Sequence, residues 1–407
     1  MKGIPEIRFN KYSEKWESLN AGTLFYPVTD KGYPELPVLS ASQEEGMIPR
    51  KDIGINMSYS RKNVGGYKRV LPGDFVVHLR SFQGGFAHSA SEGITSPAYT
   101  VLRLNKERNQ DDNFWKHYMT SMNFIDSLRI VTYGIRDGRN INVSEFLDTN
   151  LIFPKDKQEQ TAIGKFFDDL DEYISSQALE LQKLKNIKKA CLEKMFPKEG
   201  ELVPEIRFNG FEGNWERTTL NNFLETKVEK NENDKYNKYD IFSVSGEYGV
   251  VNQIEFQGKS FAGASLKGYK VTHLGQVIYT KSPLKAQPYG IIKTNNATDG
   301  IVSTLYAVYE PKGEVDTSFI QYYFELDGRL NNYLRPLVNK GAKNTLLISD
   351  DDALKGYVTF PKDVTEQKEI TKYFLCLDNF IYNAVKKLDK LKQIRKGLLE
   401  KMFVANN

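Results

Sequence analysis

Two long stretches of the chain have the same pattern of apolar and polar positions. The first covers residues 153–196, and the second begins at Phe360, 207 positions after Phe153, with no gap between the patterns. In both copies apolar residues recur at steps of four and three, a 3.5-residue period typical of a coiled coil. The predicted pairing positions are Ile163, Phe167, Leu170, Ile174, Leu181 and Leu184 in the first copy, and Ile370, Phe374, Leu377, Ile381, Leu388 and Leu391 in the second.

This apolar stripe is too narrow to bury either helix in a globular core. Each helix would be about 35–40 residues long, or roughly 55 Å at a rise of ~1.5 Å per residue. Each therefore needs a partner of similar length, and the obvious partner is the other copy. We expect the two helices to pair and to act as a spacer.

A shorter duplication supports this division into halves. Residues 5–16 and 204–215 both begin with Pro-Glu-Ile-Arg-Phe-Asn and end with Trp, and the two copies lie 199 positions apart. Each half is thus ordered as lead-in, body and long helix, and the Pro- and Gly-containing residues 197–204 form a linker. The predicted domains are 1–152, a helix at 153–197, a second domain at 198–359 that includes the linker, and a helix at 360–407.

The two bodies, roughly residues 18–152 and 217–359, resemble one another only in patches. Short apolar runs such as FVVHL, AYTVLRL, QVIYT and LYAVY predict strands bounded by Gly and Pro turns. Residues 114–130 and 317–334 have helical spacing. The predicted fold class is α/β (α+β): two mixed domains separated by two long antiparallel coiled-coil helices, with an internal pseudo-two-fold repeat.

The amino-acid composition limits the classes of protein to which the chain can belong. The 407 residues are 40% hydrophobic and 12% aromatic, as in a folded globular protein, and the net charge of +4 means that any strongly basic surface is local. No run of about 18 apolar residues predicts a membrane span, and the N-terminus has no signal-peptide core. Cys191 and Cys376 both lie in the helical repeats and are expected to be reduced, which favours the cytoplasm.

Motifs for catalysis are missing from the sequence. There is no P-loop, no G-x-G-x-x-G after a strand, no H-E-x-x-H, no paired C-x-x-C and no Asp/Asn-Pro-Pro-Tyr/Phe loop. None of the four histidines, His78, His88, His117 and His273, has a partner at a metal-ligand spacing. We therefore predict neither a catalytic residue nor a metal site.

Two loops in each body have the residue types that contact DNA. Arg or Lys fits the guanine edge, Asn or Gln fits the adenine edge, and cations and amides also bind phosphates. An ordinary solvated turn remains the alternative for each single residue. The predicted DNA-contacting residues are Arg80, Ser81, Gln83, Tyr133, Arg136, Arg139 and Asn140 in the first body, and Lys281, Ser282, Lys285, Gln287, Asn339, Lys340, Lys343 and Asn344 in the second.

In these features the chain resembles a known family, the specificity subunit (HsdS) of type I restriction–modification systems. The resemblance rests on the doubled order of lead-in, body and helix, and on the helix entry P-x-x-x-x-E-Q-x-x-I. This entry occurs at Pro154, Glu159, Gln160 and Ile163, and again at Pro361, Glu366, Gln367 and Ile370. It covers essentially the whole chain. The one departure noted, Lys11-Tyr12 in place of Gly210-Phe211, concerns a turn.

The resemblance implies a non-catalytic DNA-recognition subunit. Each body would be a target recognition domain for one half of a bipartite site in double-stranded DNA. The helices would set the gap and dock two modification subunits, and the pairing positions named above are the residues predicted for this docking as well. S-adenosylmethionine would be bound by the modification subunits, and ATP and Mg²⁺ by the partner complex with its restriction subunits. A stand-alone sequence-specific DNA-binding protein and a coiled-coil adaptor that does not touch DNA remain alternatives. A catalytic restriction or modification polypeptide is disfavoured by the missing motifs.

Overall fold

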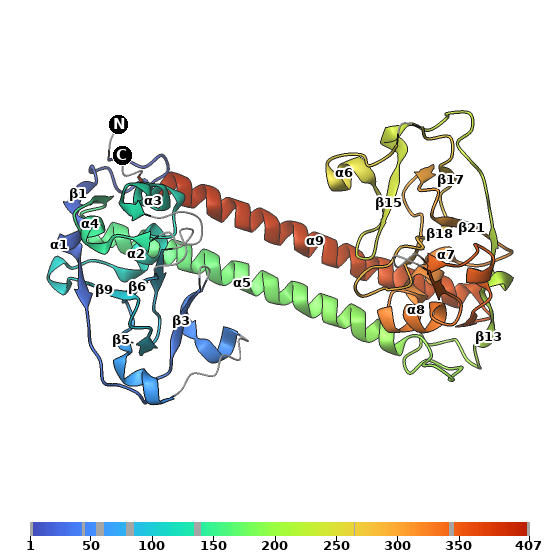
Figure 1. The fold of residues 1–407 in the computed structure, drawn as a ribbon, viewed down its shortest axis with the longest axis horizontal. Coiled ribbons are helices and arrows are strands. Elements are labelled where there is room, and N and C mark those ends of the chain that lie inside the picture. The colour runs from blue at the N-terminus through green and yellow to red at the C-terminus, as the bar shows by residue number, and fades with distance from the viewer. Residues whose placement is uncertain are drawn as a thin grey trace. The chain divides into compact units, whose positions relative to one another are not determined.

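The computed structural model describes residues 3–42, 45–53, 61–78, 85–133, 140–263, 265–341 and 346–404. The chain divides into two compact units (Figure 1). Unit 1 comprises Met1–Leu179 and Lys386–Asn407, and unit 2 comprises Glu180–Val385. Because both boundaries fall inside long helices, each unit contains one body and a part of each helix.

The two long helices are α5 (Lys157–Lys194) and α9 (Val364–Met402), of 38 and 39 residues. The prediction of two long helices at these places is confirmed. Along both of them, the side chains at the four-and-three positions are buried or half-buried, whereas most residues between them are exposed. This narrow stripe is the signature of a helix that packs against one other helix.

In each unit the helix segments pack antiparallel. In unit 1, Asp171 of α5 forms an ion pair with Arg395 of α9, and the ring of Phe167 stacks on that of Phe403. In unit 2, Lys188 forms an ion pair with Asp378 (2.7 Å), and Phe196 stacks on Phe374. In both units, higher residue numbers on one helix meet lower numbers on the other.

The two sets of contacts are equivalent under the internal repeat. A shift of 207 positions carries Asp171 onto Asp378 and Lys188 onto Arg395. The stacked pairs are equivalent too, with ring centroids 5.7 Å apart in unit 1 and 6.0 Å in unit 2. The pseudo-two-fold repeat predicted from the sequence is therefore present in the side-chain contacts of each unit.

The body of unit 1 is built on a four-stranded antiparallel sheet of order β2-β9-β6-β7, with the two-stranded ribbons β1–β12, β3–β4, β5–β8 and β10–β11. Its strands are β1 (Glu17–Asn20), β2 (Phe25–Val28), β3 (Leu39–Ser42), β4 (Gly46–Pro49), β5 (Lys68–Val70), β6 (Phe75–Val77), β7 (Phe86–His88), β8 (Gly93–Thr95), β9 (Thr100–Leu104), β10 (Thr132–Tyr133), β11 (Asn140–Ile141) and β12 (Asn150–Phe153). Its helices are α1 (Ala21–Leu24), α2 (Asp112–Tyr118), α3 (Met122–Ser127) and α4 (Val143–Leu147), with the 3-10 turn η4 (Leu128–Val131).

The body of unit 2 repeats this plan with a sheet of order β14-β21-β18-β19 and the ribbons β13–β24, β15–β16, β17–β20 and β22–β23. Its strands are β13 (Glu216–Thr219), β14 (Leu224–Thr226), β15 (Phe242–Ser245), β16 (Gly249–Asn252), β17 (Lys270–Thr272), β18 (Val277–Tyr279), β19 (Ile292–Thr294), β20 (Gly300–Val302), β21 (Ala307–Pro311), β22 (Asn339–Lys340), β23 (Leu346–Leu347) and β24 (Tyr357–Phe360). Its helices are α6 (Gln253–Gln257), α7 (Thr317–Tyr323) and α8 (Asp327–Leu334).

One of the two central strands of each sheet, β6 in unit 1 and β18 in unit 2, is buried on both faces, which explains its unbroken apolar sequence. In unit 1, Phe75 and Val77 of β6 face the main core, and Val76 faces a smaller cluster under β3 and β4. Successive strand residues point to opposite faces, so three apolar residues in a row serve two cores. The main core also takes up Phe167 of α5 and Phe403 after α9, and so ties the body to the helix pair.

The residues that recur in the lead-in and at the helix entry form one buried cluster in each unit. In unit 1, Arg8 binds Glu159 through two hydrogen bonds of 2.6 and 2.7 Å, and the indole N–H of Trp16 donates to the same carboxylate at 3.3 Å. In unit 2, Arg207 and Trp215 bind Glu366 in the same way, at 2.6, 2.8 and 3.2 Å. This cluster fixes the lead-in against the first turn of each long helix.

The glutamine beside each of these glutamates orients the body. The side chain of Gln160 accepts from the backbone N–H of Asp111 at 3.0 Å and donates to the carbonyl of Pro154 at 2.8 Å. Gln367 makes the same two bonds to Asp316 and Pro361. Because Asp111 and Asp316 are the N-caps of α2 and α7, the Glu-Gln pair joins lead-in, body and long helix at one point. The repeated sequence motif is thus explained by repeated contacts.

Candidate nucleic-acid interface

The predicted DNA-contacting residues of unit 2 belong to two hairpin loops. The first loop connects β18 to β19 and contains Lys281, Ser282, Lys285 and Gln287. The second connects β22 to β23, and of its residues Gly341 is described, whereas the predicted contacts Lys343 and Asn344 lie outside the described residues. Both loops therefore leave strands whose other ends are anchored in the body.

Lys281 brings these two loops together. Its ammonium group donates to the carbonyl of Ile348 at 3.0 Å, one residue after β23, and also binds the carboxylate of Asp350. Lys270 binds the same carboxylate at 2.7 Å. Burial alone would raise the pKa of Asp350, but the hydrogen bonds from the two lysines outweigh it and the pKa is lowered. Asp350 therefore stays ionised and holds both loops in place.

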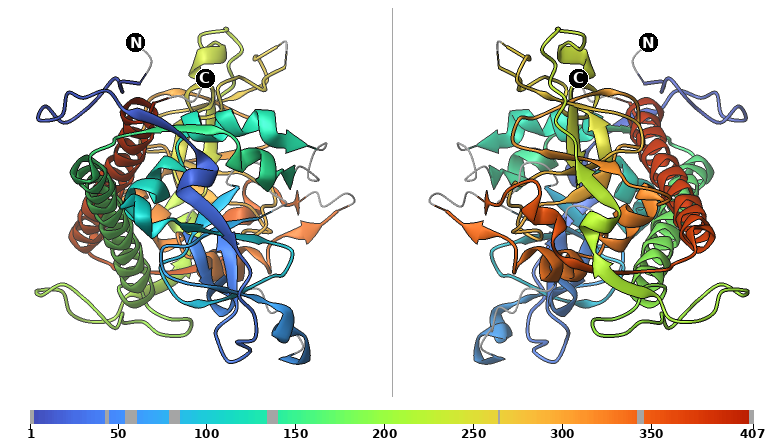
Figure 2. Two further views of the ribbon diagram at one scale, coloured as in Figure 1. Left: turned by 90° about the vertical axis from the view of Figure 1, so that its left-hand side faces the viewer. Right: turned by 90° about the vertical axis from the view of Figure 1, so that its right-hand side faces the viewer.

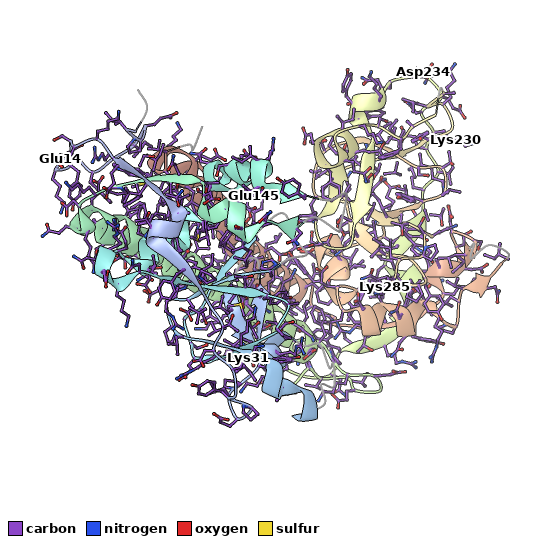
Figure 3. The ribbon with its side chains drawn as sticks, turned by 60° about the vertical axis from the view of Figure 1, so that its left-hand side comes forward. Glu14, Lys31, Glu145, Lys230, Asp234 and Lys285 are labelled. Atoms are coloured by element: carbon purple, nitrogen blue, oxygen red, sulfur yellow. The ribbon has the colours of Figure 1, made fainter. Side chains whose placement is uncertain are left out.

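Some of the remaining predicted side chains form hydrogen bonds within the protein, and others are exposed to solvent. Gln287 donates to Asp327, and the hydroxyl of Ser282 donates to the carbonyl of Thr280 at 3.2 Å. Lys285, labelled in Figure 3, and Asn339 are exposed. The backbone of Lys340 lies in β22, and its side chain is outside the described residues. Of the predicted contacts of unit 2 whose side chains are described, the exposed ones are thus Lys285, on the first loop, and Asn339, in β22 at the base of the second.

Unit 1 has the same pair of loops in the same places. The loop after β6 is closed by a bond from the N–H of His78 to the carbonyl of Gly85 at 3.1 Å, and the second loop by Tyr133, which lies opposite Asn140 in the β10–β11 ribbon. The predicted contacts within the loops lie outside the described residues; they are Arg80, Ser81, Gln83, Arg136 and Arg139.

The bases of these two loops also touch in unit 1. A side chain on Gly85 would place its Cβ 2.5 Å from the Cδ1 atom of Ile141, the last residue of the β10–β11 ribbon. Glycine at this position therefore allows the first loop to return directly against the second. Each unit brings its two predicted loops together, although unit 1 uses close packing where unit 2 uses the lysine–aspartate contact.

Tyr133 and Asn140, at the base of the second loop, are both exposed. The Tyr133 hydroxyl donates to Glu145 of α4 at 2.6 Å, and this hydrogen bond raises the pKa of the phenol. The tyrosine is therefore held against α4 with its ring in solvent. It is positioned to support the loop and to offer a ring face to a ligand.

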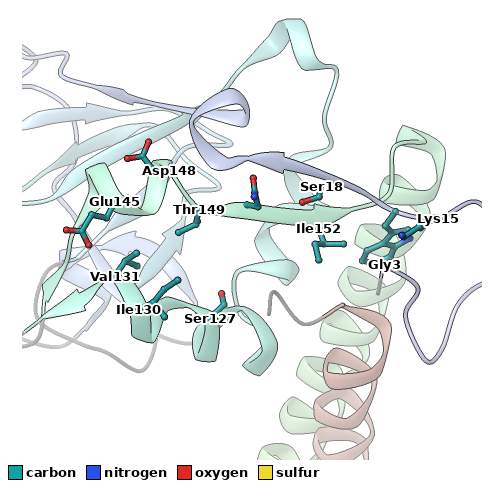
Figure 4. A pocket seen from close by; sticks show the side chains of 12 residues that line it. Gly3, Lys15, Ser18, Ser127, Ile130, Val131, Glu145, Asp148, Thr149 and Ile152 are labelled. Carbon is teal, nitrogen blue, oxygen red and sulfur yellow. The ribbon is translucent and has the colours of Figure 1, made fainter. Parts of the chain in front are cut away.

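A pocket of about 680 Å³ lies beside this ribbon (Figure 4). Its lining includes Ile130, Val131 and Ile152, with Lys15, Glu145 and Asp148 among its charged groups. Because two carboxylates face one lysine, its charge does not favour a phosphate group. The DNA-binding prediction therefore does not rest on this pocket.

A second depression, at the start of α5, is lined mainly by positively charged residues, unlike the pocket beside the β10–β11 ribbon. Four of its lining residues are cations, Arg108, Lys155, Lys157 and Lys165, with Asp156 as the one acid. Residue types alone could not reveal it, because Arg108 precedes the helix by about fifty positions and the fold brings them together. Such a basic surface suits a phosphate backbone.

The predicted helix-pairing residues are all buried or half-buried in α5 and α9. They are Ile163, Phe167, Leu170, Ile174, Leu181, Leu184, Ile370, Phe374, Leu377, Ile381, Leu388 and Leu391. They face the partner helix or the bodies and leave little surface for a further protein. Their assignment to the docking of other subunits stays a prediction.

Among the residues that the structure describes, no helix has the length and apolar character to cross a lipid bilayer. The described residues also contain no group of three or more His, Cys, Asp or Glu side chains placed to hold a metal ion.

Comparison with known proteins gives a likeness of fold. No protein-family model matches the sequence, and a search of curated proteins finds no match. The crystal structure of the type I restriction–modification system S subunit from M. genitalium matches with a TM-score of 0.60 at 15% identity, covering 98% of this chain and 99% of that chain. A structure described as the basis of complex assembly and conformational transition of the type I R-M system matches with a TM-score of 0.54 at 16% identity, covering 96% of this chain and 98% of that one. The chain therefore has the fold of a type I S subunit along nearly its whole length.

Proposed function

We propose that this chain is the specificity subunit of a type I restriction–modification complex and recognises a bipartite site in double-stranded DNA. The observation that carries the proposal is that both units have the same pair of loops on the same frame, where the frame means the lead-in, the long helices and the Arg–Glu–Trp cluster that joins them. The buried Arg–Glu–Trp clusters recur bond for bond in both units, while the loop residues that they position differ. A constant frame with two different loop pairs suits a protein that recognises two different short sequences.

In this proposal each body binds one half-site. Direct recognition needs side chains that reach base edges in the major groove, and phosphate contacts fix the register. Lys285 is exposed on the first loop of unit 2 and Asn339 at the base of the second, and Tyr133 and Asn140 flank the second loop of unit 1. Arg80, Arg136 and Arg139 are the matching cationic candidates of unit 1. The basic depression at the start of α5 is assigned to phosphate contact.

The helix pair sets the distance between the two half-sites. Both helices continue from one unit into the other without a break, and each unit holds both helices in register through an ion pair and a stacked aromatic pair. Two half-sites about one helical turn apart, ~34 Å, present the same face of the DNA. A continuous helix pair supports a fixed separation better than a flexible linker would.

The chemistry belongs to other subunits in this proposal. Two modification subunits, which use S-adenosylmethionine, would methylate adenine, and restriction subunits, which use ATP and Mg²⁺, would translocate and cleave the DNA. The chain itself would be non-catalytic and would bring these activities to the site. The S-subunit fold along nearly the whole chain supports this division.

The test is an adenine-methylation map of DNA from cells that express this chain together with its modification subunit. A split motif, with two short defined halves around a fixed gap, is the expected result. A continuous motif, or an unchanged map despite a stable complex, would contradict the proposal for this chain. Failure to form any complex would favour a stand-alone DNA-binding protein or an adaptor.

A further inference from the structure

The β15–β16 hairpin of unit 2 ends beside the first predicted DNA-contacting loop. Its turn comprises residues 246–248. A Cβ atom on Gly246 would lie 3.9 Å from the side-chain amide of Gln287, which belongs to the loop between β18 and β19. In Figure 2 the hairpin belongs to the yellow part of the chain and the loop to the orange part, and both parts lie in the same body. The turn is thus a third element at the place where the sequence predicts DNA contacts.

The same turn occurs in unit 1 between β3 and β4. The hydroxyl of Ser245 accepts from the backbone N–H of Tyr248 at 3.2 Å, and the hydroxyl of Ser42 accepts from that of Glu45 at 3.3 Å. The next residue in both turns is a glycine with a positive φ, 71° in unit 2 and 75° in unit 1, which other residues rarely adopt. Tyr248 and Glu45 therefore hold equivalent positions in the two units.

In unit 1 this turn also points toward the first predicted loop. Met47 of β4 and Ser89, the residue after β7, form a parallel bridge. A Cβ atom on Gly46 would lie 2.3 Å from the carbonyl oxygen of His88, so glycine allows β4 to run directly against β7. Because the two segments are parallel, the turn before β4 lies toward the loop before β7.

The side chains that the two turns present are different. Tyr248 in unit 2 and Glu45 in unit 1 are both exposed, but one is aromatic and the other is acidic. Residues 43 and 44 lie outside the described residues. The bonds that fix the turn are thus kept in both units while an exposed side chain changes, as in the two predicted loops. This is the pattern expected where each unit recognises a different base sequence.

Tyr248 offers a fixed apolar surface rather than a charge. It is 57% exposed and packs against the ring of Phe256 of α6, which is 47% exposed, with ring centroids 5.5 Å apart. The side chain of Gln253 fixes α6 to β15 through a hydrogen bond of 3.1 Å. The adjacent Glu247 forms an ion pair with Lys185 of α5 at 3.8 Å, so its charge is balanced within unit 2. The two rings are therefore held in place in solvent beside the first loop.

The structure of DNA limits what such a surface can contact. The faces of the bases are stacked inside the duplex, and their edges in the major groove present mainly hydrogen-bonding groups, but thymine also presents a C5-methyl group. Apolar side chains contact this methyl group in sequence-specific complexes. Lys285, exposed on the adjoining loop, is a cation suited to phosphate contact. An aromatic side chain on the turn is thus suited to the one apolar group that the groove offers.

We propose that Tyr248, supported by Phe256, contacts the C5-methyl group of a thymine in the half-site of unit 2. This assignment rests on the proposed function and adds the β15–β16 turn to its two loops. Tyr248 is then a specificity-determining residue, because removal of its ring would relax the choice of base at one position only. Its equivalent Glu45 has no apolar surface for a methyl group, so the effect is confined to one half-site.

The test uses the full chain in complex with its modification subunit and measures affinity for duplexes by fluorescence anisotropy at one fixed salt concentration. Each thymine of the recognised site is replaced in turn by uracil, which pairs like thymine and lacks only the methyl group. At one position, in one half-site, wild type should bind the uracil duplex about fourfold more weakly, the equivalent of one buried methyl group. Tyr248→Ala should bind both duplexes equally at that position, whereas Tyr248→Phe keeps the ring and should keep the preference.

Tyr239→Ala is the matched control. Tyr239 is 63% exposed and lies at the other end of the hairpin, where its carbonyl accepts from the side chain of Asn252 at 2.6 Å, and this variant should keep the preference for thymine. Thermal unfolding verifies that each variant is folded. Absence of a response to uracil at every thymine would overturn the assignment, as would a preference that survives in folded Tyr248→Ala or is lost in Tyr239→Ala. If wild type does not distinguish its site from an unrelated duplex, it is the proposed function that fails.

Discussion

The Arg8–Glu159 and Arg207–Glu366 pairs show how single residues build this frame. Both glutamate side chains are 2% exposed, and each accepts two bonds from a guanidinium and one from an indole. A buried charge that loses its partner is strongly destabilising, because the remaining ion keeps its desolvation cost without compensation. Removal of one partner therefore tests whether the ion pair holds the lead-in against the long helix.

Arg8→Ala should destabilise unit 1 by about 3–5 kcal/mol, because it leaves Glu159 buried and unpaired. Urea denaturation followed by circular dichroism measures the loss. The double variant Arg8→Met with Glu159→Leu is the control and should cost less, since it removes both charges. Equal stability of Arg8→Ala and the double variant would show that the pair does not hold the lead-in.

His117 gives unit 1 a pH dependence that unit 2 lacks at the corresponding site. Burial lowers its pKa, and the hydrogen bond to Asp168 offsets this only in part, with Lys116 and Asp171 as the other charged neighbours. The unfolded chain, with an ordinary histidine pKa of about 6.5, then binds a proton that the folded chain does not. Stability is present above this pH and is lost as the pH falls below it.

His117→Tyr should therefore flatten the stability profile of unit 1 just below pH 6.5. The corresponding residue of unit 2 is Tyr322, which already donates to Asp378 beneath the equivalent stacked ring of Phe374. The difference in unfolding midpoint between wild type and variant, measured at pH 5 and pH 7.5, isolates the histidine from other titrating groups. A difference that stays the same at both values would contradict this assignment.

Residue type predicted the candidate site only in part, for a physical reason. The side chains of Lys281 and Gln287 are of types that contact DNA, yet in the fold they bind Asp350 and Asp327. Asp350 is 69 positions from Lys281, and no local pattern connects the two. Lys285, two positions before Gln287, is exposed as a DNA contact requires. Whether a cation is free depends on long-range packing, which the loop sequence does not contain.

At the scale of secondary-structure elements, the long helices were the most predictable part of the chain. Their 3.5-residue period extends over almost forty residues, and the repeat provides a second copy of the same signal. The strands of the bodies are three to five residues long in the main sheets, and several pair over long distances. Glu17 of β1, for example, lies opposite Phe153 of β12. Such pairings depend on the whole body and not on the strand sequence.

The helix pair should act as a ruler whose length can be changed. Insertion of one heptad after Leu179 in α5 and after Lys386 in α9, at repeat-equivalent positions, adds roughly 10 Å at ~1.5 Å per residue. The unread gap should then widen by about three base pairs at ~3.4 Å each, and both half-site sequences should be unchanged. An adenine-methylation map of cells expressing the longer chain measures this.

Insertion into α5 alone is the control for the ruler. It would shift the two helices out of register, so that the ion pairs of both units could not form together, and methylation should be lost. If the doubly extended chain kept the parental gap, the helices would not set the spacing.

At the scale of the whole molecule, the two joined bodies, each recognising one half-site, should bind one DNA duplex more tightly than either body would alone. The second contact becomes intramolecular once the first has formed, and such linkage can raise affinity on the order of 100-fold or more. This gain requires that the gap in the DNA fit the protein. One added base pair shifts a half-site by ~3.4 Å and turns it by about 35°.

A duplex with the correct gap should therefore bind at least tenfold more tightly than one with a single extra base pair, a modest part of the linkage gain. Fluorescence anisotropy at one fixed salt concentration measures this, since salt alone changes affinity steeply. A duplex with one half-site scrambled is the control and should bind like the misfitted one. Equal affinity for duplexes of every gap length would indicate a flexible connection between the two bodies.

The order of residues in the two units has a consequence for synthesis on the ribosome. Unit 2 is one continuous stretch, Glu180–Val385, whereas unit 1 is completed by Lys386–Asn407, and its core contains Leu399, Met402 and Phe403. The body made first must therefore wait for the last residues to emerge, while the body made second can fold before it. During that interval Phe114 and Phe167 lack the ring of Phe403 that packs on both. Until Leu399, Met402 and Phe403 are made, the core of unit 1 is thus incomplete, and a variant in which these three side chains are truncated to Ala is expected to destabilise the N-terminal body although they lie at the far end of the sequence.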